Sequence, residues 1–168
     1  MDFSNQEQQK EYIDFRFNQG VDVMPTCVIT AKSGEVRAFA IPFSNEDEKR
    51  NCILALRRLV QKLDAVTYTF MSTVQIGASN GIKPSEQLDS REGVMFSVRT
   101  RNSVDVTLWM IEQSEDGSKS PVNPTKTGDA GGELSDLFDV APYNRLTYTK
   151  KRKIDKLVKS LLKPQTIH

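Results

Sequence analysis

The chain has 168 residues, of which 38% are hydrophobic and 27% are charged, and its formal net charge is +1. This size and composition suit one domain with a buried core, and no apolar run approaches the ~20 residues that a membrane-spanning helix requires. The polar, acidic N-terminus does not resemble a secretion signal. The sequence therefore predicts a cytoplasmic protein, located in the host cytoplasm if the chain is viral.

Histidine and cysteine are scarce, and their scarcity excludes several kinds of site. The one histidine is His168, so a Ser-His-Asp triad, a Cys-His pair and a histidine-rich zinc site each lack a component. Neither of the standard glycine-rich phosphate-binding motifs occurs. Cys27 and Cys52 fall in apolar patterns and are expected to be reduced core residues. No cofactor is predicted.

The N-terminal part of the chain begins with a helical pattern and continues with two strand patterns. Ser4 and Glu7 fit a capping box for a helix over 4–18. Residues 24–31 and 36–43 have strand patterns separated by a short glycine-containing turn. The two strands are therefore expected to form a hairpin.

The clearest helix is predicted over 45–63. Asn45 is placed to cap it, and Glu48 with two further acids suits the positive end of the helix dipole. The apolar residues recur at helical spacing and predict a core-facing stripe of Cys52, Leu56, Leu59, Val60 and Leu63. The basic residues between them indicate a solvated surface, with a binding face as the alternative.

Alternating apolar residues predict three more strands, over 66–76, 94–101 and 104–112. In the last of them Trp109 points away from the main apolar stripe. The face that carries Trp109 must therefore be covered by a helix or a partner, and self-association is one way to cover it. We take Arg99, Arg101 and Trp109 as a candidate partner-binding face of the sheet.

The C-terminal third of the chain changes composition. Residues 114–133 are polar and contain several glycines and prolines, which predicts a flexible loop or linker. Residues 134–140 mix acidic and apolar side chains, either as a docking motif or as a cap on the core. A final amphipathic helix, ending near Pro164, has one apolar face and one strongly basic face. The candidate nucleic-acid-binding residues on the basic face are Lys150, Lys151, Arg152, Lys153, Lys156 and Lys159.

These elements predict an α+β fold in the order α-β-β-α-β-β-β-α. The strands most simply form a single antiparallel sheet of about five strands, with the 45–63 helix packed on one face. The expected organisation is an α+β core over 1–113, a flexible linker over 114–133, and a C-terminal part over 134–168 that holds a short turn and the basic helix.

The connection over 81–93 is longer than a hairpin needs, and it carries three acids spaced by three. If this stretch were helical, Glu86, Asp89 and Glu92 would share a face and could hold Mg²⁺ or Mn²⁺. A proline, two flanking glycines and Arg91 argue instead for a structural turn or a partner contact. The candidate partner-binding residues are therefore Glu86, Asp89 and Arg91 in the loop, together with Arg99, Arg101 and Trp109 on the sheet.

The stretch KPSEQLDSREGVMFSV resembles a family of small, uncharacterised bacterial and phage proteins. In that family a P-S-E-x-x-D-R-E-like loop joins two strands, and the matching residues here are Pro84, Ser85, Glu86, Asp89, Arg91 and Glu92. Ser90 is inserted between the aspartate and the arginine. The acidic and aromatic motif of the family's preceding strand is absent, since this chain has MSTVQI there. The resemblance covers about residues 40–112 and implies a fold and a phage or bacterial setting, but no reaction.

The sequence favours a non-catalytic binding or adaptor protein, encoded by a phage or a bacterium, that docks on a host or viral macromolecule. A protein partner is preferred because the net charge is near zero, a homo-oligomer is possible, and no membrane partner is expected. The basic helix leaves a nucleic-acid-binding accessory protein as one alternative. A metal-dependent hydrolase or nuclease that uses Glu86, Asp89 and Glu92 is the other, so the sequence weighs against an enzyme without excluding one.

Overall fold

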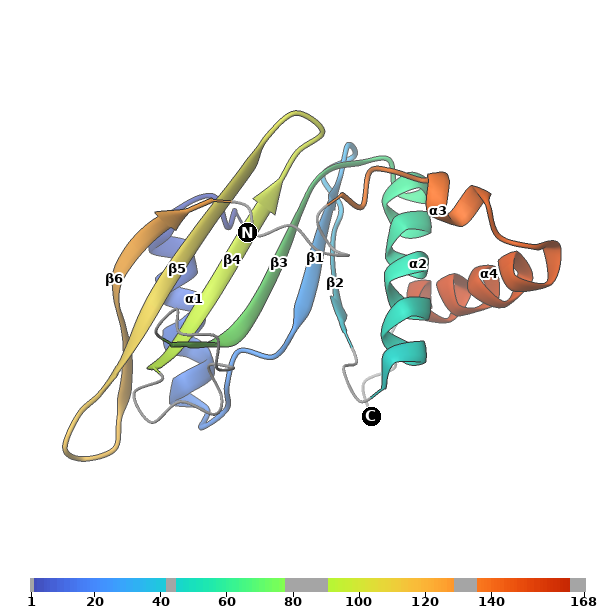
Figure 1. Ribbon diagram of the computed structural model, residues 1–168. Helices are drawn as coiled ribbons and strands as arrows, with labels where there is room; N and C mark the ends of the chain where they lie inside the picture. The colour runs from blue at the N-terminus through green and yellow to red at the C-terminus, as the bar shows by residue number, and fades with distance from the viewer. Residues whose placement is uncertain (1, 42–44, 78–90, 129–135, 164–168) are drawn as a thin grey trace.

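A computed structural model of the chain describes residues 2–41, 45–77, 91–128 and 136–163. These residues form one open antiparallel sheet of six strands, in the order β2-β1-β3-β4-β5-β6, and four helices (Figure 1). The elements are α1 Gln6–Asn18, β1 Thr26–Ala31, β2 Val36–Ala40, α2 Glu46–Lys62, β3 Ala65–Ile76, β4 Arg91–Arg99, β5 Val104–Gln113, β6 Lys119–Thr127, α3 Ala141–Asn144 and α4 Tyr148–Leu162. The predicted α+β class and the single antiparallel sheet are confirmed, but the sheet has one strand more than predicted.

The additional strand, β6, lies in the segment that the sequence predicted to be a linker. It pairs antiparallel with β5 although it contains Pro121 and Pro124. An edge strand tolerates proline because only one of its sides must supply hydrogen-bond donors to a neighbour. The register of the pair shifts near Asn123, whose φ is 52°. Over this range the polar, proline-containing composition belongs to an edge strand and not to a linker.

Local signals account for the starts of the first two helices. Asn45 caps α2 as predicted, since its side chain accepts a hydrogen bond from the backbone N–H of Glu48 at 2.7 Å. The cap of α1 is Asn5 and not the predicted Ser4, and it accepts from the N–H of Glu7 at 2.8 Å. Asparagine and serine have nearly equal preferences for this position, so adjacent candidates cannot be separated from sequence.

Helices cover each face of the sheet at one end only, and the covered end differs between the two faces. On one face α2 packs over β1, β2 and β3, and four of the five residues of its predicted stripe are buried there, while Leu63 is half-buried. On the other face α1 packs over the half of the sheet that contains β4, β5 and β6 (Figure 1). The molecule therefore has two hydrophobic clusters, one on each side of a single sheet.

The C-terminal helix α4 packs on α2, as a further layer outside it (Figure 1). Ile154 and Val158 are completely buried and belong to the same hydrophobic cluster as the buried stripe of α2. The apolar stripe of α4 therefore packs mainly on α2. As a result α2 lies between the sheet and α4, and the basic face of α4 points outward.

Two polar contacts join α4 to α2. The ammonium group of Lys150 donates to Oδ1 of Asn51 at 2.8 Å, and Nε of Arg58 lies 3.7 Å from Oδ1 of Asp155. Asn51 and Arg58 are seven residues apart and lie on the same side of α2, with Ala55 between them. Ala55 is completely buried, and its small side chain allows the two helices to approach closely.

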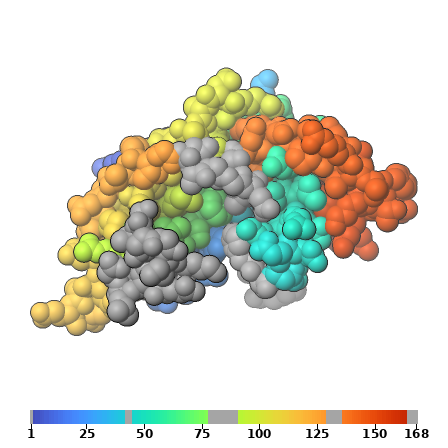
Figure 2. All heavy atoms as spheres, viewed as in Figure 1, coloured from blue at the N-terminus to red at the C-terminus, as the bar shows by residue number. Residues whose placement is uncertain are grey.

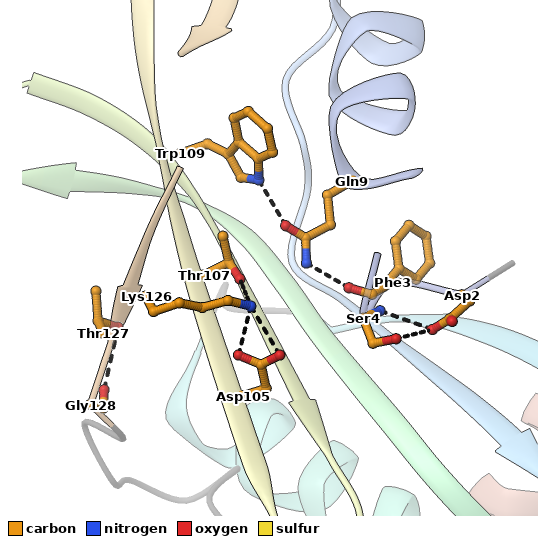
Figure 3. Close-up of polar contacts among 10 residues, drawn as sticks. All are labelled: Asp2, Phe3, Ser4, Gln9, Asp105, Thr107, Trp109, Lys126, Thr127 and Gly128. Carbon is orange, nitrogen blue, oxygen red and sulfur yellow. Dashed lines mark hydrogen bonds and ion pairs between the residues drawn. The ribbon is translucent and has the colours of Figure 1, made fainter. Parts of the chain in front are cut away.

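Trp109 forms the main polar connection between α1 and the sheet. Its side chain is only 4% exposed, and its indole Nε1 donates to Oε1 of Gln9 at 2.8 Å (Figure 3). Nε2 of the same glutamine donates to the backbone carbonyl of Phe3 at 2.5 Å. One buried amide therefore satisfies two other buried polar groups. The sequence predicted that either a helix or a partner covers Trp109. In the structure a helix, α1, covers it.

Replacing Gln9 by leucine is expected to lower the free energy of unfolding by about 1–3 kcal/mol, because the indole N–H and the Phe3 carbonyl would stay buried without partners. Adding Trp109→Phe removes the unpaired N–H, so the double variant should lose less stability than the two single variants combined. Urea unfolding followed by circular dichroism measures all three, with Gln6→Leu on the exposed side of α1 as control. Losses that simply add would contradict this coupling.

Candidate functional site

The predicted partner-binding sheet face is not one surface. The register of β4 against β5 places Arg99 and Trp109 on opposite faces of the sheet. Trp109 is buried under α1, and Arg101 lies in the β4–β5 turn with its guanidinium 5.0 Å from the centre of the Phe138 ring. The grouping of these three residues is therefore wrong in its geometry. A partner contact by either arginine stays a prediction.

The acidic loop before β4 lies mostly outside the described residues, including Glu86 and Asp89. Arg91 and Glu92 are the first two residues of β4. Glu92 accepts a hydrogen bond from Nζ of Lys119 at 2.9 Å, and this bond raises the pKa of the lysine. Within the described ranges no three His, Cys, Asp or Glu side chains are grouped to hold a metal ion. The proposed metal site stays a prediction.

The segment that precedes α3 contributes to the core. Leu137 is completely buried, and the ring of Phe138 packs 5.4 Å from that of Tyr68. The Tyr68 hydroxyl accepts a hydrogen bond from the backbone N–H of Leu137 at 3.0 Å, and Arg57 donates to two backbone carbonyls of the segment. The sequence left two alternatives for this segment, a docking motif or a cap on the core. The burial of Leu137 fits a cap on the core, and this side chain is not accessible to a partner.

The outer face of α4 carries a continuous exposed line of side chains. The residues that we call the α4 ridge follow one another at spacings of four, four and three, and they are Tyr148, Arg152, Lys156 and Lys159. All four are exposed, and in Figure 2 α4 lies at an outer end of the molecule beside α2. Lys150 and Lys151, which were also candidates, are half-buried: Lys150 is hydrogen-bonded to Asn51 of α2, and the ammonium group of Lys151 lies 5.8 Å from the ring centre of Tyr143 of α3. The structure thus separates the predicted basic residues into an outward set and an inward set.

Tyr148 is the member of the ridge that sequence reasoning missed. Its side chain is 75% exposed, and the guanidinium of Arg152 lies 5.8 Å from its ring centre. Tyr148 precedes the run of basic residues in the sequence and was not among the candidate nucleic-acid-binding residues. The structure makes Tyr148 the first residue of α4, because Thr147 caps the helix by accepting from the N–H of Lys150 at 3.3 Å. The threonine cap was the signal that could have placed the tyrosine on the basic face.

A second feature lies on the flank of α4 that faces β2. A partly open apolar pocket of about 410 Å³ lies there, lined by residues of β2, α2 and α4. Its apolar walls include Cys52, Ile154, Leu157 and Leu161, and the two charged residues that line it are Glu48 and Lys153. Lys153 comes from α4 and Glu48 from the first turn of α2. The pocket is therefore an apolar hollow with opposite charges on facing walls.

No family model, curated protein or solved structure matches this chain. Among the helices of the described ranges, none is both long and apolar enough to cross a bilayer. The loop resemblance stays an expectation.

Alkaline pH is expected to destabilise the fold. Burial raises the pKa of Tyr68 to about 12 and that of Cys52 to about 11, and it raises the pKa of Cys27 as well. These groups lose their protons at lower pH in the unfolded chain, so stability should be complete below about pH 8 and should fall between about pH 9 and 12. Urea unfolding at a series of pH values measures the loss. Tyr68→Phe should show a shallower pH dependence, and an equal dependence in both proteins would contradict the assignment to Tyr68.

Proposed function

We propose that this chain is a binding protein that docks on a macromolecule, and that the α4 ridge contacts the phosphate backbone of a nucleic acid. The observation that carries the proposal is the exposure of Tyr148, Arg152, Lys156 and Lys159 along one line of a helix whose other side is anchored on α2. Cations held along a rigid line can neutralise successive phosphates without reading sequence.

The near-neutral net charge favours a protein partner. The distribution of charge over the surface, however, supports a nucleic acid. Some lysines elsewhere in the protein are paired, since Lys119 and Lys126 lie 2.9 Å and 2.8 Å from carboxylate oxygens (Figure 3 shows the second). By contrast, none of the described carboxylates forms an ion pair with Arg152, Lys156 or Lys159. Cations without neighbouring carboxylates attract a polyanion and increase its rate of association.

The exposed tyrosine supports single strands over duplexes. A single strand offers the faces of its bases, and stacking of one base on an aromatic ring contributes roughly 1–3 kcal/mol. Tyr148 lies next to Arg152, so a base on the ring and a phosphate on the guanidinium can be bound together. In a duplex the bases are already stacked, and only the phosphate contacts remain.

Fluorescence anisotropy with a labelled single-stranded 20-mer tests the proposal. Three ridge cations predict that log K falls with log salt with a slope of about −2, because each phosphate contact on a single strand contributes about −0.7. The triple variant Arg152→Gln, Lys156→Gln and Lys159→Gln should lose at least about tenfold in affinity and most of this slope. Tyr148→Ala should weaken binding to the single strand more than binding to a duplex of the same length.

The matched control removes three exposed cations elsewhere, with Lys32→Gln, Arg50→Gln and Lys62→Gln. It changes the net charge by the same amount and is expected to retain most of the affinity. Equal losses in the two triple variants would mean that total charge, and not the α4 ridge, determines binding. Absence of binding at 50 mM salt would contradict the proposal altogether.

A further inference from the structure

We infer that the pocket between β2, α2 and α4 is a separate docking site, which receives an aliphatic side chain of a protein partner with a carboxylate beside it. Leu157 and Lys153 of this pocket lie on the flank of α4 toward β2, whereas the α4 ridge points away from α2. The inference goes beyond the proposed function and does not depend on it.

The shape and lining of the pocket favour an aliphatic group. Its volume of about 410 Å³ falls within the range of sites that bind ligands. Leu157 and Leu161 are one helical turn apart and line it together, and both are only half-buried. Ile154, on the same helix, is completely buried. Insertion of one aliphatic side chain would complete the burial of the two leucines and contribute to affinity through the apolar surface removed from water.

The charges around the pocket define the chemistry of the partner. Lys150 is held by its hydrogen bond to Asn51, so Lys153 is the cation of α4 that can bind an incoming group. Among the described residues no carboxylate is ion-paired with Lys153. Its exposed ammonium group therefore complements a carboxylate beside the aliphatic anchor.

The opposite wall of the pocket distinguishes its occupant from a nucleic acid. Glu48 lines the pocket from α2, and Glu46 and Asp47 are exposed in the same helical turn. These acids repel a phosphate backbone, whereas a protein segment can present a carboxylate to α4 and a neutral or basic residue to α2. A protein segment is thus the occupant that fits both walls.

The test uses the full chain with labelled methyl groups and the peptide acetyl-QELQQQLQQ-amide, which has two leucines four residues apart, one glutamate beside the first leucine and otherwise neutral side chains. We expect NMR titration to shift the methyl signals of Ile154, Leu157 and Leu161. A peptide with lysine in place of glutamate should bind at least about fivefold more weakly, a difference typical of one or more exposed ion pairs. A peptide with serine in place of leucine should not shift these signals.

Two variants localise the binding. Leu157 lines the pocket from α4, so Leu157→Asn should abolish the shifts of Ile154 and Leu161, whereas Leu162→Asn, at a leucine of α4 that is also half-buried but lies outside the pocket, should not. Lys153→Glu should reverse the preference and favour the lysine peptide. Leu157→Asn should leave oligonucleotide binding unchanged, which separates this site from the α4 ridge.

Four results would overturn the inference. One is the absence of methyl shifts at millimolar acidic peptide. A second is equal binding of the glutamate and lysine peptides. A third is peptide binding that survives Leu157→Asn. The last is a shift of the same methyl signals by a single-stranded oligonucleotide, which would make a nucleic acid the occupant of the pocket.

Discussion

The packing of α4 on α2 is the constraint on which both candidate surfaces depend. Ala55 is completely buried between Asn51 and Arg58, the two residues through which α2 makes polar contacts with α4. With a small residue at that position, the buried side of α4 can lie close to α2 while its charged side faces outward. A detached α4 would leave the pocket without one wall, and a free 15-residue helix is only marginally stable in water.

The two ends of the sheet have different roles. At the β4–β6 end, α1 covers the sheet and several charges are internally paired, as in the contact of Lys126 with Asp105 and the hydroxyl of Thr107 (Figure 3). At the β1–β2 end, α2 completes the core, and α4 adds a layer whose cations lack carboxylate partners among the described residues. Both surfaces that we propose for binding lie at this second end, on neighbouring sides of one helix.

Features determined by local chemistry were predictable from the sequence. The cap at Asn45 and the apolar stripe of α2 depend on neighbouring residues alone. Tertiary constraints were not predictable. Gly93 was expected to flank a turn, but it lies inside β4. A Cβ at this position would come within 2.6 Å of Cδ1 of Ile76 and 3.0 Å of the backbone oxygen of Trp109. For the site, composition identified the basic residues of α4. The structure divides these residues among the ridge, the contact with α2 and the wall of the pocket. This division depends on how α4 packs on α2, and no local sequence pattern contains that information.

The central claim is that α4 is held against α2. Native-state hydrogen exchange of the α4 amides tests this claim most directly. The account predicts that amides between Arg152 and Leu162 exchange far more slowly than those of an unstructured peptide. Ala55→Phe should separate the helices and remove this protection, while β3, β4 and β5 stay protected. Exchange of α4 in the unaltered protein at the rate of an unstructured peptide would contradict the account, because neither the ridge nor the pocket would then have a fixed support.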